Sequence, residues 1–155
     1  MQVWIDADAC PKAVREIILR ACRKRRVPVT LVADRYLHIK ASKLVRAIQV
    51  PRGQDAADDQ IASMMAKDDV VITGDIPLAS RVVELGGTAL NPRGELYTEA
   101  NVRERLSIRD FAQDLRDFGV DTGGPKPYTE RDRKRFADAF DRTLTQQLAR
   151  SRADQ

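Results

Sequence analysis

Short apolar runs alternate with segments of helical spacing along residues 1–90, and this alternation limits the chain to few folds. Apolar, β-forming runs predict strands at 3–5, 29–33, 44–50, 70–73 and 88–90, and helical spacing predicts helices at 11–26, 55–67 and 77–85. Strands that alternate with helices pair in parallel through right-handed crossovers. We therefore predict an α/β fold: an open parallel sheet of about five strands with helices on both faces.

The alternation stops after residue 91. Helices are predicted at 101–118 and 130–150, and we expect both of these C-terminal helices to pack on the sheet. The glycine and proline residues of 122–127 predict a loop between them. A chain of 155 residues suits one domain. We assign residues 1–150 to a single domain and expect 151–155 to be a disordered tail.

Composition gives weaker constraints. The formal net charge of +4 mildly favours an anionic partner such as RNA. No apolar run approaches the roughly 20 residues that a membrane helix needs, so no membrane partner is expected. The N-terminus lacks the layout of a secretory signal, and a cytoplasmic location is the expectation. One histidine and two cysteines exclude most zinc sites and Ser-His catalytic pairs.

Polar side chains, nearly all of them acidic, follow the predicted strands at the points where the strands end. Because the carboxyl ends of parallel strands share one edge of a sheet, we expect these residues to lie together although they are far apart in the sequence. In chain order they are Asp6 and Asp8, Asp34, then Asp55, Asp58 and Asp59, then Asp75 and finally Asn91.

Carboxylates held together repel one another and raise one another's pKa values unless a cation compensates them. Mg²⁺ or Mn²⁺ suits oxygen ligands, and a bound ion would orient and polarise a phosphodiester. The candidate metal ligands are Asp6, Asp8, Asp58, Asp59 and Asp75; the candidate catalytic residues are Asp6, Asp59 and Asp75; and the candidate supporting residues are Asp55, Asn91 and Thr73.

Aspartate is also a common helix N-cap, which is a purely structural role. Asp8, Asp55 and Asp75 each precede a predicted helix, so each could serve only as a cap. Asp6 ends an apolar strand, and Asp58 and Asp59 both lie inside a helix, where aspartate is a mediocre helix former. Capping does not explain these three positions.

Four other residues carry possible chemistry. Arg93 directly follows the fifth strand and Lys126 lies in the rigid 122–127 loop, so these two are the candidates for binding substrate phosphate. Cys10 stands beside acidic residues that would raise its pKa, and packing is its expected role. His38 is expected on the surface, in a loop.

Five motifs of this chain closely resemble the signatures of the bacterial YaiI/YqxD family. They are Asp6-Ala7-Asp8-Ala9-Cys10-Pro11, Asp55-Ala56-Ala57-Asp58-Asp59, Thr73-Gly74-Asp75-Ile76-Pro77-Leu78-Ala79, Asn91-Pro92-Arg93-Gly94-Glu95 and Thr122-Gly123-Gly124-Pro125-Lys126-Pro127. The resemblance runs from Met1 to about Leu148 in the family's order and spacing. It implies a PIN-like, NYN-related α/β fold and brings no established activity.

A wider resemblance to PIN-like nucleases rests on fewer residues. Asp6 matches the acid that ends the first strand, Asp58 or Asp59 resembles the mid-chain acid on a helix, and Asp75 resembles the acid after the fourth strand. PIN nucleases use these positions to hold Mg²⁺ or Mn²⁺ and cut RNA. The chain departs from the pattern after Asp75, where 76–78 are apolar instead of carrying another acid.

Three functions follow as hypotheses. The leading one is a metal-dependent ribonuclease or related phosphodiesterase. The second is a haloacid-dehalogenase-like phosphatase, because Asp6 and Asp8 form the strand-then-DxD pattern of such enzymes and Thr73 fits their second motif. Against it, a helix starts at Pro11, which leaves no room for the flap segment that these enzymes insert after the DxD pattern. The third is a non-catalytic module that binds RNA or a protein.

Overall fold

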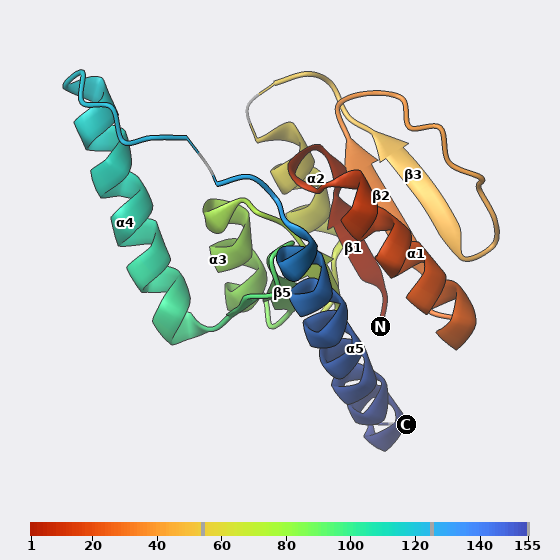
Figure 1. Ribbon diagram of the computed structural model, residues 1–155. Coiled ribbons are helices and arrows are strands. Elements are labelled where there is room, and N and C mark those ends of the chain that lie inside the picture. Colours follow the sequence, from red (N-terminus) through yellow and green to blue (C-terminus); the bar gives the residue numbers. More distant parts are fainter. Residues whose placement is uncertain (54, 125, 155) are drawn as a thin grey trace.

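The sheet at the centre of the fold has six strands in the order β3-β2-β1-β4-β5-β6 (Figure 1). The structure is a computed structural model that describes residues 1–53, 55–124 and 126–154. The strands are β1 Val3–Asp6, β2 Val29–Ala33, β3 Val45–Gln49, β4 Val70–Ile72, β5 Thr88–Leu90 and β6 Leu96–Tyr97. β1 to β5 are parallel, and β6 is antiparallel to β5.

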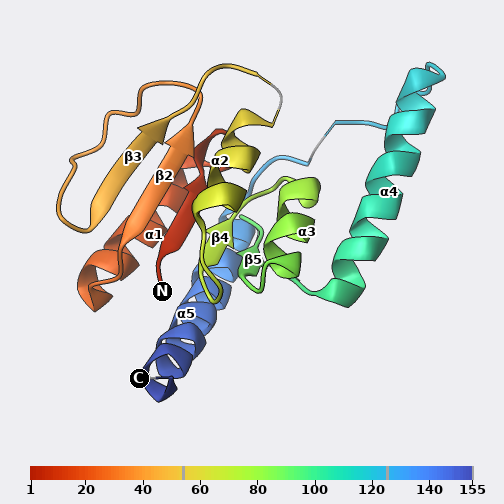
Figure 2. The same cartoon turned by 180° about the vertical axis from the view of Figure 1, so that it is seen from behind.

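Helices cover both faces of this sheet, as the alternation predicts. The helices are η1 Ala7–Ala9 (a 3₁₀ turn), α1 Lys12–Arg25, α2 Ala56–Met64, α3 Ile76–Glu84, α4 Glu99–Asp117 and α5 Glu130–Ala153. Side chains alternate across a strand, so Val3 and Ile5 of β1 pack with α1 and α5, whereas Trp4 between them packs with α2 and α3. Figure 2 shows α2 and α3 on the face opposite α1 and α5.

The strand order reverses direction at β1, which pairs with β2 on one side and with β4 on the other. In an open parallel sheet such a switch point leaves a crevice at the carboxyl ends of the two diverging strands. Asp6 ends β1 at this place, and the 73–75 segment follows β4 beside it. The topology therefore brings the motif after β1 and the motif after β4 together.

The opposite end of the same two strands is fixed by a buried aspartate. Asp69, directly before β4, accepts hydrogen bonds from the backbone N–H of Gln2 at 3.0 Å, the indole N–H of Trp4 at 3.0 Å and the backbone N–H of Ala66 at 2.9 Å. Three donors satisfy the carboxylate, which explains how a charged group tolerates burial here.

The last two helices differ from each other in what they cover. α5 lays Phe136, Phe140 and Leu144 against the sheet, as predicted. α4 packs on the outer side of α3 instead, and Val102 is its one buried residue. Both views show α4 standing at the edge of the molecule, beyond α3 (Figures 1 and 2).

Other boundaries also differ from the prediction. β6 was not predicted, because two residues give too short a pattern. Residues 34–44 cross from β2 to β3 without a helix. α5 continues to Ala153, so residues 151–153 are helical where a disordered tail was predicted, and residue 155 lies outside the described residues. In the predicted 122–127 loop, the described residues have no regular structure.

No helix in the described ranges is both long and apolar enough to cross a membrane.

The turn between β5 and β6 contacts the backbone of α5 closely at Gly94. Gly94 has φ +92°, and a Cβ at this position would lie 2.8 Å from the backbone oxygen of Arg135. Gly123 has a similar φ of +79°, but a Cβ there would meet nothing within 4 Å. Both glycines thus have a positive φ, and only at Gly94 would an added Cβ also clash with neighbouring atoms.

We expect Gly94→Ala to lower the free energy of unfolding by about 2–4 kcal/mol, from the left-handed backbone and from the clash together. Gly123→Ala is the matched control and is expected to cost about 1–2 kcal/mol from the backbone alone. Urea denaturation measures both values, and equal losses in the two variants would show that the contact with α5 is not tight.

Candidate functional site

A hydrogen-bonded network joins the ends of β1 and β4 at the switch point. The hydroxyl of Thr73 donates to Oδ2 of Asp6 at 2.8 Å and accepts from the backbone N–H of Asp75 at 3.0 Å. Thr73 is fully buried and Asp6 is only 4% exposed. Ile5 of β1 pairs with Ile72 of β4. The residues that follow these two along the chain, Asp6 and Thr73, therefore lie side by side. Parallel pairing itself creates this contact.

The helix α2 brings a third carboxyl to the same place. Asp58 lies in the first turn of α2 and is 7% exposed. It precedes the fully buried Ile61 by three residues, so both side chains lie on the face of the helix that packs on the sheet. No hydrogen bond to its carboxyl group exists within the part of the chain that the structure describes.

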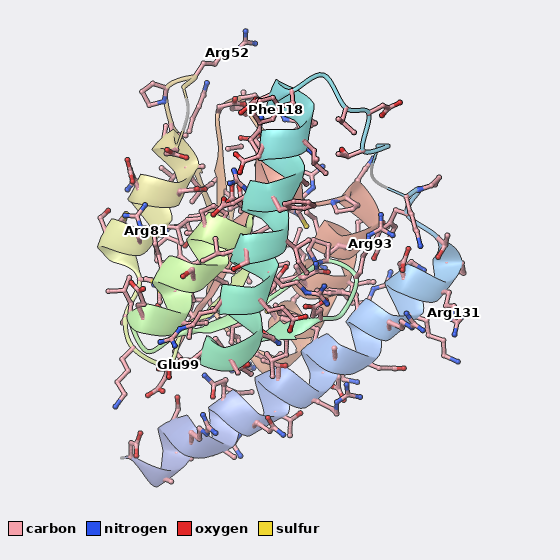
Figure 3. All side chains as sticks on the ribbon, turned by 90° about the vertical axis from the view of Figure 1, so that its left-hand side faces the viewer. Arg52, Arg81, Arg93, Glu99, Phe118 and Arg131 are labelled. Carbon is pink, nitrogen blue, oxygen red and sulfur yellow. The ribbon has the colours of Figure 1, made fainter. Side chains whose placement is uncertain are left out.

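Asp59 lies elsewhere, and its predicted place among the metal ligands and catalytic residues is corrected. One residue along a helix turns the side chain by about 100°, so Asp59 points out to solvent and pairs with Arg81 of α3 at 2.7 Å. Figure 3 shows Arg81 on the outer side of this helix pair. Of the two neighbouring acids, Asp58 is the one that reaches the site.

Of the three candidate caps, Asp75 is the one whose side chain makes a capping bond among the described residues. Oδ1 of Asp75 accepts from the backbone N–H of Leu78 at 2.9 Å and caps α3. Asp55 occupies the N-cap position of α2 with φ +67° and makes no side-chain capping bond. Asp8 lies within η1, and its Oδ2 accepts from the backbone N–H of Asp34 at 2.7 Å, which ties η1 to the start of the β2–β3 crossover.

These side chains line one pocket of about 310 Å³, which we call the acidic pocket. Its lining residues follow the carboxyl ends of the strands, and that edge of the sheet faces the top of Figure 1. Its acidic residues are Asp6, Asp8, Asp34, Asp55, Asp58 and Asp75. Among the described residues that line it, Arg109 of α4 is the single basic one. The acids that the topology was predicted to gather therefore meet, with Asp59 excepted.

The negative charge in the acidic pocket is poorly compensated. Burial raises the pKa of Asp6 to about 6; the hydrogen bond from Thr73 opposes this rise, and repulsion from Asp75 and Asp8 adds to it. Burial likewise raises the pKa of Asp58 to about 7; repulsion from Asp75, Asp6 and Asp55 adds to this rise, and attraction to Arg81 opposes it. Carboxyl groups in such surroundings keep their protons to higher pH than free aspartate does. Within the described residues, no three His, Cys, Asp or Glu side chains converge closely enough to ligate one ion together.

The two residues predicted to bind phosphate lie outside the acidic pocket. Arg93 donates to Asp132 at 2.7 Å and to the backbone oxygens of Pro127 and Lys126, and its guanidinium lies 5.6 Å from the ring centre of Tyr128. Figure 3 shows Arg93 beside the N-terminal end of α5. Arg93 thus fixes the segment that enters α5, and the side chain of Lys126 is exposed at this segment.

Asn91 belongs to the same structural region. Its amide donates to the hydroxyl of Tyr97 at 3.2 Å, and its backbone oxygen accepts from Gly94 at 2.9 Å. It shapes the β5–β6 turn and does not line the acidic pocket. Of the three predicted supporting residues, Thr73 and Asp55 lie at the site and Asn91 does not.

Cys10 and His38 have the surroundings that were expected. Cys10 is buried in the core, and burial raises the pKa of its thiol to about 12. A protonated thiol is a poor nucleophile. His38 is exposed in the β2–β3 crossover, with its ring centre 5.0 Å from that of Tyr36 in an edge-on arrangement.

Comparison with known proteins agrees with the motifs. Over residues 4–146 the chain matches the family described as "Uncharacterized BCR, YaiI/YqxD family". The chain belongs to this family. A UPF0178 protein of Dechloromonas aromatica is 54% identical over 144 residues, covering 93% of this chain and 96% of that protein. A UPF0178 protein of Geobacter metallireducens is 53% identical over 152 residues, covering 98% of each chain.

The YaiI/YqxD motifs account for most of the acidic pocket, since three of the five contribute residues to it. Arg109 lies outside every motif, and its approach depends on how α4 packs. No solved structure matches the chain. The family description assigns no reaction, so the chemistry is argued from the site itself.

The raised pKa values predict a pH-dependent stability. In the folded protein Asp6 and Asp58 keep protons that the unfolded chain releases near pH 4. The folded state therefore binds more protons between about pH 4 and pH 7, and the free energy of unfolding falls as pH rises through this window. We expect Asp58→Asn to stabilise the protein at pH 8 by roughly 2–4 kcal/mol, and by less at pH 5.

Calorimetry without divalent ions, at pH 5 and pH 8, measures this difference. Asp59→Asn is the matched control: it removes the same charge one residue away and loses an exposed ion pair worth at most about 1 kcal/mol. If Asp58→Asn changed stability equally at both pH values, Asp58 would not hold a proton in the folded state.

Proposed function

We propose that this protein is a metal-dependent phosphodiesterase that cleaves RNA, using Mg²⁺ or Mn²⁺ held in the acidic pocket by one or two of the carboxylates of Asp6, Asp58 and Asp75 together with water. One observation carries the proposal: three carboxyl groups from separate motifs line a single pocket at the switch point of the sheet, and burial there raises the pKa values of Asp6 and Asp58. Ligands of open α/β sheets bind at this place.

The donor chemistry fits a hard divalent cation. Each of these side chains offers carboxylate oxygens, the ligands that Mg²⁺ prefers. Mg²⁺ commonly takes one or two protein carboxylates, keeps several waters and accepts substrate phosphate, so a set of three converged side chains is not required. When bound, the ion would polarise the phosphodiester and lower the pKa of an attacking water.

The side chains of the chain itself have distinct roles in this proposal. The Thr73 hydroxyl donates to Oδ2 of Asp6, so Oδ1 is its available oxygen. Asp75 is held through Oδ1 by its cap to Leu78, so Oδ2 is its available oxygen. Asp58, with a pKa near 7, releases its proton as a cation binds, which makes cation binding stronger at higher pH.

Arg109 replaces Arg93 and Lys126 as the proposed phosphate ligand. It lines the acidic pocket from α4, on the side that the sheet does not cover. A guanidinium binds phosphate oxygens through paired N–H groups. The departure from the PIN-like pattern after Asp75 limits this resemblance to the acids Asp6, Asp58 and Asp75, and the proposal uses those alone.

The phosphatase and the non-catalytic binding module stay alternatives. A phosphatase of the haloacid dehalogenase type would need Asp8 as a free acid near Asp6, whereas Asp8 accepts the backbone N–H of Asp34. A binding module would retain RNA binding when the acids of the pocket are replaced. The following experiment separates these outcomes.

We expect the wild-type protein to hydrolyse single-stranded RNA with Mn²⁺ at pH 8, and Asp58→Asn to lose roughly 100-fold in kcat/KM, because a lost ligand weakens stabilisation of the transition state. Gel analysis of labelled RNA measures the rate. Asp59→Asn is expected to stay near the wild-type rate, since Asp59 pairs with Arg81 outside the pocket.

Activity that is unchanged in Asp58→Asn and in Asp6→Asn would rule out the acidic pocket as the catalytic site. Equal hydrolysis with Mn²⁺ and with EDTA would exclude the ion. Trapping with beryllofluoride, together with hydrolysis of phosphomonoesters, would favour the phosphatase.

We expect Arg109→Gln to lower kcat/KM by about tenfold or more, because the phosphate loses its charged hydrogen-bond donor. Arg103→Gln removes the same charge from another exposed position of α4 and should leave the rate near wild type. If both variants lost activity equally, the effect of α4 would be its overall charge and not the position of Arg109.

A further inference from the structure

A second pocket, of about 260 Å³, lies between α1 and the β2–β3 crossover; we call it the basic pocket. Its basic lining residues are Lys12, Arg15, Arg23, His38 and Lys40. Glu16 is its one acidic residue among the described ones, and Leu31 and Val45 of the sheet line its apolar part. The basic pocket thus combines positive charge with an apolar surface.

Among the described residues, no acidic side chain pairs with the positive charge of the basic pocket. Within the described ranges, no carboxylate lies within ion-pair distance of Lys12, Arg15, Arg23 or Lys40. In addition, Nε of Arg15 is buried without a hydrogen-bond partner, the one such side-chain atom in the described residues. A buried donor without an acceptor is unfavourable. The side chains that line the basic pocket thus offer an anionic ligand positive charge that the described carboxylates leave unpaired.

An aromatic residue stands beside this charge. Tyr36 is 70% exposed, which is unusual for a large ring, and it packs edge-on against His38. His38 itself lines the basic pocket. Proteins that bind single-stranded nucleic acids pair a basic groove with exposed aromatic rings on which bases stack. The crossover carries both features within five residues.

The basic pocket adjoins the acidic pocket along two separate segments of chain. Asp8 and Asp34 line the acidic pocket, while Lys12 and His38 line the basic one. Each pair is four residues apart, and four residues span at most about 14 Å. A strand of a few nucleotides at about 3.4 Å per nucleotide covers that length.

We propose that the basic pocket and Tyr36 bind the flanking nucleotides of a single-stranded RNA whose scissile phosphodiester lies in the acidic pocket. The inference rests on the proposed function, since it names the part of the substrate beside the reacting bond. The pocket binds a phosphate through Lys12, Arg15 and Lys40, and Tyr36 stacks on a base. A base next to a phosphate distinguishes a nucleic acid strand from a lipid headgroup or an acidic peptide.

Fluorescence anisotropy with a labelled 10-nucleotide single-stranded RNA tests this, in EDTA so that no cleavage occurs. We expect Lys12→Gln/Lys40→Gln to weaken binding about tenfold and to reduce the salt dependence by about 1.4 in log Kd per log salt, from two lost phosphate contacts.

Tyr36→Ala should weaken binding at least about fivefold with an unchanged salt dependence. Arg131→Gln/Lys134→Gln, on exposed positions of α5, is the control with the same charge loss and wild-type affinity.

Several results would overturn the inference: no RNA binding by the wild type, equal affinity of the Lys12/Lys40 variant and the α5 control, or tighter binding of phosphatidylglycerol vesicles than of RNA. Single-stranded DNA of the same sequence shows whether the sugar is read, and weaker binding of duplex RNA supports stacking on Tyr36. Thermal unfolding confirms that each variant is folded.

Failure of this inference is distinguishable from failure of the proposed function. Bis(p-nitrophenyl) phosphate is too small to reach the basic pocket from the acidic one, so the Lys12/Lys40 variant should hydrolyse it at the wild-type rate. If RNA binding is as expected but neither RNA nor this diester is cleaved, the catalytic proposal fails and the binding surface stands. If the diester is cleaved but the basic pocket does not affect RNA, the reverse holds.

Discussion

The contact between the Thr73 hydroxyl and the Asp6 carboxyl supports the whole carboxyl edge of the sheet. It joins the two central strands at the place where their crossovers diverge, and the same hydroxyl accepts the N–H of Asp75 and so sets the start of α3. α2 packs beside this network and adds the buried carboxyl group of Asp58 to it. The acidic pocket is therefore a result of the topology, assembled from segments that the fold must bring together in any case.

Two buried aspartates show how one residue type serves structure in one place and chemistry in another. Asp69, at the amino end of β4, accepts three N–H groups and is fully satisfied. Asp58 is similarly buried and has no such donors among the described residues, so its pKa rises. A satisfied carboxylate stabilises a fold, whereas one without donors costs stability that a ligand can restore. This contrast is the physical basis for locating the site at the carboxyl edge.

The sequence was sufficient for the parallel sheet and for most acids of the pocket, because hydrophobic periodicity and strand ends are local signals. The choice of Asp59 over Asp58 was avoidable: Ile61 sets the buried face of α2, and three residues before it is Asp58. Arg93 was assigned from its position after a strand, but its partner Asp132 is far along the chain. Arg109 had no local signal at all, since its place depends on α4 packing against α3.

The burial of both cysteines has a practical consequence for studying α4. The thiols of Cys10 and Cys22 are enclosed by the core, and burial raises the pKa of each to about 12, so neither reacts readily with maleimides. A cysteine introduced on the exposed side of α4, such as Ser107→Cys, would then take a dye or spin label selectively in the otherwise natural chain. The mobility of this helix, free and with RNA, becomes directly measurable by spectroscopy.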